Sequence, residues 1–349
     1  MGSITPATEP PAVQTSPKRR LSQTDFLEDE KSPTSTYDVL IVGGGISGLS
    51  AAATIVRQDH SVLILDSQKY RNAGSPHMHT VATWDHRNPA DWRAAARKDF
   101  DRYGTVTLEY DNVDKISKTD NDIFVATSAS GKSWSAKKVI LATGVEDVFP
   151  AIPGYAENWI TGIFHCLYCH GWEEKGAESS GVFAEGEAAA VLPALHFARQ
   201  ALRISKSVTI YTHGNTQLAE DIETALNGSS APMKVDSRKI VKLEKPGKRS
   251  GVIIHTEDGS SKVEGFLAHK PKSRLRGSLH EQLGLDLGPK GTIASKPPFG
   301  QSNVKGLFVA GDMSTPMQTV TMAQATGTSA GAGAPLQLQA EMWNQTPIF

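Results

Sequence analysis

Residues 37–48 read YDVLIVGGGISG, a short run of β-branched and aliphatic residues that ends at three glycines. The run at 37–42 predicts a buried parallel strand, because strands covered on both faces are continuously apolar. We expect a helix from Ile46 to about Arg57, and residues 61–66, SVLILD, predict a second buried strand. Together these elements predict a βαβ unit.

The glycines of this unit have the spacing GxGxxG. Gly43 permits a tight turn, Gly45 lets backbone amides approach a pyrophosphate, and Gly48 lets helix and strand pack closely. The helix N-terminus then faces the phosphates. Asp66, about twenty residues further on, is placed to accept hydrogen bonds from an adenosine ribose. The loop therefore predicts a dinucleotide with an unphosphorylated adenosine ribose; a glycine-rich turn without a ligand is the alternative.

Composition limits the class of protein. The chain has 349 residues, 39% of them hydrophobic and 21% charged, with a formal net charge of -1. Such a chain is globular and long enough for two domains, and it carries no basic field for nucleic acid. It has no stretch of roughly 20 apolar residues and no apolar signal core. Residues 1–36, rich in Pro, Ser and Thr, predict a disordered tail, and we expect a cytoplasmic protein that binds neither nucleic acid nor membrane.

Further elements follow from local patterns. Asn88 and Pro89 predict the start of a helix that reaches Arg102. Three short strands, at 105–110, 122–128 and 137–142, suggest a small antiparallel layer. A second βαβ-like pattern has strands at 181–184 and 207–211 around a helix at about 187–204, and a last strand at 306–310 precedes a helix at 318–339.

The two cysteines of the chain, Cys166 and Cys169, form one CxxC. Such a pair closes a small-ring disulfide, and a position at a helix start would lower the thiol pKa, so a redox pair is the leading interpretation. A zinc site with His165 and His170 is an alternative, but adjacent residues rarely point at one ion. Two buried cysteines without chemistry are the third possibility. We expect no metal.

Together with ATG at 142–144 and GLFVAGD at 306–312, these motifs resemble the thioredoxin reductase family of flavoproteins. The resemblance implies an α/β homodimer whose chain forms two Rossmann-like, three-layer domains, the second inserted into the first. It implies an FAD-binding domain in two parts, 37–150 and 291–349, around a central domain at 151–290.

The resemblance also implies site residues. Asp312 would bind the flavin ribitol, Cys169 would lie against the flavin, and Cys166 would exchange with the substrate sulfur. The implied FAD site comprises Gly43, Gly45, Ser47, Gly48, Asp66, Ala142, Thr143, Gly144, Gly311 and Asp312.

A narrower resemblance is to the fungal dithiol oxidases that close disulfides in epidithiodiketopiperazine toxins. It rests on YRNA at 70–73, HMH at 77–79, WDHRNP at 84–89 and CLYCHGWEE at 166–174. In thioredoxin reductases an aspartate follows the second cysteine as acid/base; His170 stands there, and an imidazole can shuttle a thiol proton. His77, His79 and Trp84 are substrate-pocket candidates, with simple loop packing as the alternative.

The second βαβ unit departs from the family, which binds NADPH there. Its loop, residues 185–190, reads EGEAAA, and Glu185 and Glu187 would repel a pyrophosphate. Residues 211–216 offer no arginine for a 2'-phosphate. We therefore expect NADPH binding to be lost, although a divergent loop that still binds it weakly is the alternative.

These expectations combine into a functional hypothesis. The protein would be an FAD-dependent oxidase that closes a disulfide in a small dithiol metabolite and passes the electrons to O2, giving H2O2. The alternatives are an NADPH-dependent thioredoxin or disulfide reductase and, outside the enzymes, a flavin/thiol redox sensor.

Overall fold

The computed structural model describes residues 36–247 and 251–349. The predicted disordered tail, residues 1–36, lies outside the described residues except for Thr36. The first βαβ unit is present as β1 (Tyr37–Val42), α1 (Ile46–Ile55) and β2 (Val62–Leu65), and β1 pairs with β2 in parallel.

A seven-stranded sheet contains this unit. Its order is β3-β2-β1-β6-β5-β4, with β17 beside β6. The remaining strands are β3 (Val106–Glu109), β4 (Val113–Lys118), β5 (Phe124–Ser128), β6 (Ser133–Leu141) and β17 (Leu307–Val309), and α2 (Pro89–Lys98) connects β2 to β3.

The prediction of one small antiparallel layer at 105–110, 122–128 and 137–142 was partly wrong. The first of these strands, β3, pairs in parallel with β2, because the α2 crossover returns the chain in the same direction. The antiparallel layer consists of β4, β5 and β6. Strand β4 was not predicted, because its residues VDKISK are mostly polar and half of them are exposed.

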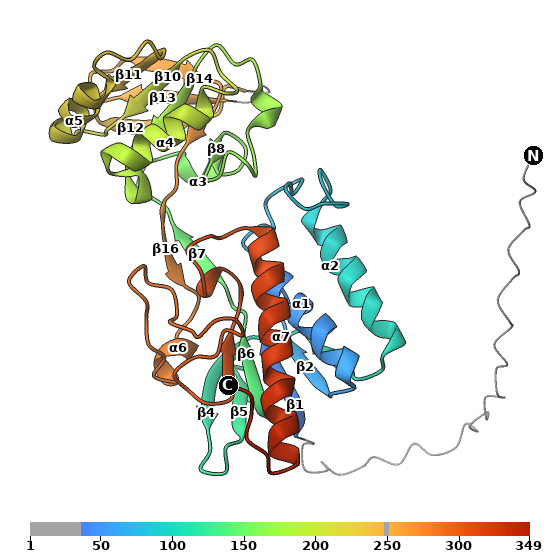
Figure 1. Ribbon diagram of the computed structural model, residues 1–349. Coiled ribbons are helices and arrows are strands. Elements are labelled where there is room, and N and C mark those ends of the chain that lie inside the picture. Colours follow the sequence, from blue (N-terminus) through green and yellow to red (C-terminus); the bar gives the residue numbers. More distant parts are fainter. Residues whose placement is uncertain (1–35, 248–250) are drawn as a thin grey trace, which may run out of the picture. The chain divides into compact units, whose positions relative to one another are not determined.

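The long helix α7 (Val320–Met342) packs against α1 (Figure 1). Two of its glycines make this close approach possible, since a Cβ on Gly327 would overlap the backbone of Ser47 and one on Gly331 that of Ala51. In the described ranges, no helix is both long and apolar enough to cross a membrane.

A second set of elements surrounds a five-stranded sheet with the order β11-β10-β9-β15-β8. Helices α4 and α5 share one buried apolar cluster with it, and the three-stranded sheet β12-β13-β14 shares another, so this region has three layers. The bounds are α3 (Tyr155–Asn158), β8 (Ile163–Phe164), β9 (Ser180–Phe183), α4 (Val191–Ala201), β10 (Val208–Tyr211), α5 (Thr216–Leu226), β11 (Met233–Asp236), β12 (Ile240–Glu244), β13 (Val252–Thr256), β14 (Ser261–Glu264) and β15 (Leu267–Ala268).

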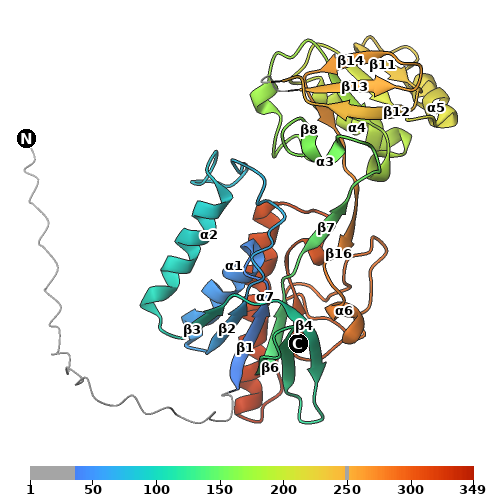
Figure 2. The same cartoon turned by 180° about the vertical axis from the view of Figure 1, so that it is seen from behind.

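Two paired strands, β7 (Val145–Val148) and β16 (Lys272–Leu275), carry the chain into this set and back (Figure 2). The return comes earlier than the predicted residue 291. Leu279, in α6 (Leu279–Gln282), and Leu285 already lie in the same buried cluster as β1 and β6. The inserted segment thus ends close to β16, and the fold class is the predicted α/β type with the second unit inserted into the first.

Candidate active site

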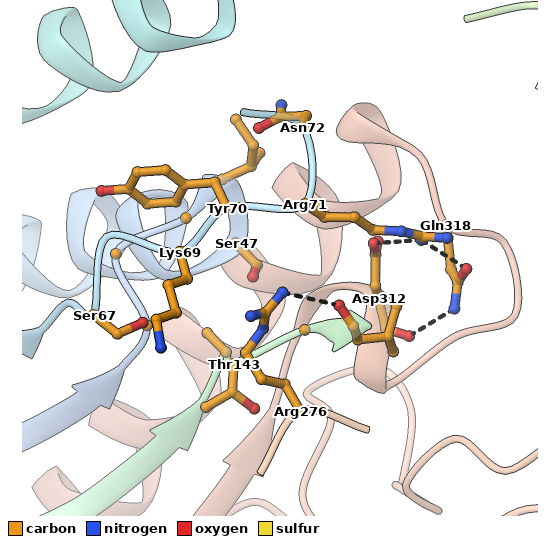
Figure 3. Close-up of a pocket in the computed structure, with 18 of the residues that line it drawn as sticks. Ser47, Ser67, Lys69, Tyr70, Arg71, Asn72, Thr143, Arg276, Asp312 and Gln318 are labelled. Atoms are coloured by element: carbon orange, nitrogen blue, oxygen red, sulfur yellow. Dashed lines mark hydrogen bonds and ion pairs between the residues drawn. The ribbon is translucent and has the colours of Figure 1, made fainter. Parts of the chain in front are cut away.

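A cavity of about 320 Å³ opens beside the first glycine loop (Figure 3). It is lined by residues from both the sheet that holds this loop and the CxxC segment. Of the residues predicted from the sequence, it collects Gly43, Gly45, Ser47, Asp66, Ala142, Thr143, Gly144, Asp312, His77, His79, Cys169 and His170. The lining does not include Gly48, Gly311, Trp84 or Cys166.

The glycine loop fits a pyrophosphate. Gly45 is the N-cap of α1 and makes no side-chain cap, and a Cβ built on it would meet no atom within 4 Å. A ligand can therefore approach the first amides of α1. Gly43 has φ +115° and lies against the backbone of Ala142, while a Cβ on Gly48 would overlap the Gly43 carbonyl. Gly48 thus has a packing role, as its position in the motif predicts.

Asp66 directly follows β2 and is 2% exposed. Its carboxylate holds together a cluster of side chains that was not predicted from the sequence. Its Oδ2 accepts hydrogen bonds from the Tyr70 hydroxyl (2.5 Å) and from Arg97 (2.8 Å). Burial, and then the hydrogen bond to Asp66, raise the pKa of Tyr70 to about 12. Oδ1 accepts a bond from the Gln68 amide (2.9 Å). Because a carboxylate oxygen accepts two bonds, Oδ1 can still bind a ribose hydroxyl.

Arg71 forms the second unpredicted cluster (Figure 3). It binds Asp147 on β7 in a bidentate manner (2.6 and 3.0 Å) and donates from Nη1 to Asp312 (2.9 Å) and Gln318 (2.8 Å). Burial opposes its charge, but the hydrogen bonds and charge of Asp147, and then those of Asp312, raise the Arg71 pKa overall. Asp312, the predicted ribitol ligand, therefore lies in the cavity as one member of an ion-pair network. The only sequence signal was the fungal-type segment at 70–73.

A disulfide joins Cys166 and Cys169, as expected for a redox pair. The expected helix start is wrong: the segment is a turn in which the amides of Cys169 and His170 both donate to the Cys166 carbonyl (3.1 and 3.0 Å). Gly171, with φ +111°, prevents a regular helix from continuing. Cys169 lines the cavity, while Tyr168 beside it is exposed. Cysteines joined in this way offer no thiolates for the alternative zinc set.

Two histidines flank the disulfide and line the cavity. The His165 ring stacks on Trp159 (5.4 Å between centroids), and its buried Nδ1 has no hydrogen-bond partner among the described residues. Burial, then the charge of Arg71, lower the His165 pKa to about 4. Burial, then the charge of His79, also lower the pKa of His170. Both imidazoles are therefore neutral at pH 7 and able to accept a proton.

Two of the three substrate-pocket candidates lie in the cavity lining and the third does not. His77 and His79 line the cavity, and His79 Nδ1 lies 2.6 Å from the Cys169 carbonyl. Trp84 is not among the lining residues; the Arg87 guanidinium lies 4.9 Å from its ring. The geometry of Trp84 agrees with the loop-packing alternative.

The second glycine-loop position differs from the first. Residues 186–188 form a single 3-10 turn after β9, and α4 begins only at Val191. The Glu185 carboxylate lies 3.5 Å from His269, and this contact lowers its pKa, so it is an anion at pH 7. Glu187 pairs with Lys270 at 2.7 Å. Two carboxylates therefore occupy the loop that would have to receive a phosphate.

Comparison with known proteins agrees with this geometry. Residues 37–327 match the family model described as pyridine nucleotide-disulphide oxidoreductase. Thioredoxin reductase tcpT of Claviceps purpurea is 43% identical over 91% of this chain and 99% of its own length, and thioredoxin reductase aclD of Aspergillus oryzae is 43% identical over 86% and 96%. Among solved structures, an oxidoreductase from Agrobacterium tumefaciens (TM-score 0.78, 28% identity, 89% and 100% covered) and HlmI (TM-score 0.79, 28% identity, 88% and 94% covered) have the same fold.

Proposed function

The chain belongs to the pyridine nucleotide-disulphide oxidoreductase family, and we propose that within this family it is a dithiol oxidase that closes an intramolecular disulfide in a small secondary metabolite. As a family member it is a flavin-dependent disulfide oxidoreductase with FAD as its cofactor. The proposal concerns the direction of electron flow, the substrate and the acceptor.

One observation carries the proposal: Glu185 and Glu187 occupy the second glycine loop, whereas Cys169 and His170 line the same cavity as the first. The redox pair therefore lies at the cavity that fits FAD. FAD bound there would supply the two-electron redox chemistry between the cysteines and O2, the proposed acceptor. The residues of the chain bind the cofactor, hold the disulfide and move protons.

The thiol chemistry is two successive exchanges. A thiolate of the substrate attacks Sγ of Cys166, the S–S bond breaks, and Cys169 leaves as a thiolate. The second substrate thiolate then attacks the substrate sulfur of the mixed disulfide and releases the thiolate of Cys166. The substrate loses two electrons and two protons, and the protein disulfide gains the two electrons. His170, neutral because burial lowers its pKa, accepts one of these protons, and solvent takes the other.

The second loop supports the substrate as the electron source. With Glu185 ionised and Glu187 beside it, the loop would repel the pyrophosphate of NADPH. The fungal-type segments at 70–73, 84–89 and 166–174 support a small dithiol as the substrate. The homodimer stays a prediction of the family resemblance, and the cytoplasmic location stays a prediction from the composition of the sequence.

The test is an anaerobic titration of the FAD-bound protein, first with NADPH and then with a small dithiol, following the flavin absorbance. We expect the dithiol, and not NADPH, to bleach the flavin, and air to restore the colour with H2O2 appearing. Rapid bleaching by NADPH would overturn the proposal and favour a disulfide reductase, as the names of the curated relatives suggest.

Two variants provide the controls. Cys166→Ser and Cys169→Ser should both bind FAD, since neither cysteine is needed for the glycine loop, but the dithiol should no longer bleach their flavin. Flavin bleaching by the dithiol at the wild-type rate in Cys166→Ser would show that the electrons bypass the disulfide. Bleaching without turnover in air would favour the redox sensor.

A further inference from the structure

A cluster of metal-ligand side chains lies next to the CxxC turn, outside the thiol chemistry described above. It consists of His79 and His86, from the loop after β2, and Glu173, from the turn that follows the cysteines. The distances between the facing ligand atoms are 3.0 Å (His79 Nε2 to His86 Nδ1), 3.3 Å (His79 Nε2 to Glu173 Oε1) and 3.9 Å (His86 Nδ1 to Glu173 Oε1).

These separations match a tetrahedral metal site. Zinc bound at 2.0–2.1 Å by nitrogen and oxygen places its ligand atoms about 3.4 Å apart. Two histidines and one carboxylate are also a known zinc-binding set, which leaves a fourth position open. The residues differ from the His165 and Cys166 set considered from the sequence.

The hydrogen bonding of His79 leaves its second ring nitrogen available as a metal ligand. Nδ1 of His79 lies 2.6 Å from the Cys169 carbonyl, which only accepts hydrogen bonds, so Nδ1 carries the proton. In a neutral ring Nε2 then has the lone pair, and it faces both Nδ1 of His86 (3.0 Å) and the Glu173 carboxylate (3.3 Å). A metal ion between these three atoms would receive this lone pair in place of a hydrogen bond from His86. A carbonyl that orients the far nitrogen of a ligand histidine is the usual outer partner in metal sites.

The histidine loop is held in place before any ion binds. The Met78 amide donates to the Arg87 carbonyl (2.8 Å) and the His86 amide to the Met78 carbonyl (2.9 Å), which closes a small hairpin. The His77 ring stacks on that of His86 at 4.0 Å. The side chain of His79 is 16% exposed, while those of His86 and Glu173 are 58% and 40% exposed, so an ion can reach the site from solvent.

We propose that His79, His86 and Glu173 form a binding site for a divalent transition-metal ion, zinc by preference. The ion would tie the loop after β2 to the segment that carries the cysteines. Nitrogen ligands favour zinc or cobalt over magnesium, which prefers oxygen.

The test uses the FAD-bound protein, treated with a chelator, desalted and kept free of thiols. Titration with Zn2+ alone, followed by calorimetry, should give one ion per chain. Co2+ should give visible absorption bands of a tetrahedral site at wavelengths beyond those of the flavin, and Mg2+ should not compete. His86→Ala and Glu173→Gln should each weaken Zn2+ binding at least tenfold, with unchanged FAD content as the check that the fold is kept.

His196→Ala is the matched control, because His196 is an exposed histidine on α4 outside the cluster. It should bind Zn2+ as the wild type does. Equal Zn2+ affinity in wild type, His86→Ala and Glu173→Gln would overturn the proposal, as would Zn2+ binding no tighter than that of Mg2+. In either case a hydrogen bond between the two histidine rings accounts for their short contact.

Discussion

The two glycine-loop regions of this chain have the same topology and opposite chemistry. Each follows a buried parallel strand, β1 or β9, and each leads to a helix that packs on the sheet. In the first, three glycines leave the N-terminus of α1 open to a cavity. In the second, two glutamates precede α4, and Pro193 removes one amide donor from its first turn.

The difference shows that packing and ligand binding make separate demands on the same βαβ unit. The hydrophobic strands and helix of the second unit are retained, with Val182, Ala194 and Ile210 fully buried in one cluster. The uncharged glycine loop is not retained, since Glu185 and Glu187 stand in it. The packing of a βαβ unit therefore does not depend on the residues that its loop offers to a ligand.

Placing a carboxylate in the first loop should make it resemble the second. In Gly45→Glu the backbone tolerates the side chain, since φ is -78° and a Cβ meets no neighbouring atom. A charge about 4 Å from the pyrophosphate costs about 4 kcal/mol at an effective dielectric constant of 20, so FAD affinity should fall about 10³-fold. FAD content after dialysis measures this. Gly45→Ala is the control and should retain FAD; equal retention by both variants would contradict the assigned phosphate site.

Substitution of His170 should show that the CxxC segment supplies the base for the reaction in the cavity beside the first glycine loop. The pKa of His170 lies below its usual 6.5, so the ring loses its proton as pH rises through that lower value and is available as a base above it. The value of kcat/KM for a dithiol should therefore rise with pH at acidic pH and become independent of the protonation of His170 once this ring has lost its proton. His170→Gln should lower kcat/KM by about 10² and remove this rise.

The control for His170→Gln is His196→Gln, a change at an exposed histidine that should leave the pH dependence of kcat/KM unchanged. Steady-state rates from about pH 5 to pH 8 suffice for both variants. A rise at acidic pH that survives unchanged in His170→Gln would assign the base to another group, with His165 the first candidate.

Neutralising the second loop should partly restore its affinity for NADPH. In the double variant Glu185→Gln/Glu187→Gln both carboxylates are lost, while the side-chain amide that replaces the Glu185 carboxylate can still accept a hydrogen bond from His269. Removal of two nearby like charges should tighten NADPH binding about tenfold, measured by nucleotide fluorescence. Glu220→Gln, an exposed change on α5, should have no effect. Wild-type binding of NADPH as tight as in the double variant would remove the repulsion argument.

The smallest expected effect concerns the N-cap of α5. The Asn215 side chain accepts a hydrogen bond from the Leu218 amide (3.0 Å) at the start of α5, whereas α1 has no such cap. Asn215→Ala should lower the free energy of unfolding by about 1 kcal/mol and the Tm by about 2 °C, without changing FAD content. Asn215→Ser should keep most of the stability; a similar loss in both variants would mean that the cap is not the cause.

The accurate predictions rest on local signals. The strand–glycine–helix pattern at 37–48, the CxxC and the carboxylates of the second loop each lie within a dozen consecutive residues. Backbone preference and charge act over that range, so spacing alone predicts them. The same reasoning failed for the β4 strand and for the supposed helix at Cys166, where polar residues and Gly171 give no clear period.

Other parts of the site depend on contacts between distant residues. Arg71 reaches Asp147 and Asp312 across 76 and 241 positions of the chain. His79 meets the Cys169 carbonyl across 90. Hydrophobic spacing and glycine motifs constrain neighbours along the chain and say nothing about which loops fold together. Local patterns in the sequence thus determined the type of fold and the redox pair. Only the tertiary structure decided which groups surround the disulfide, because packing brings the loop after β2 against the cysteine turn.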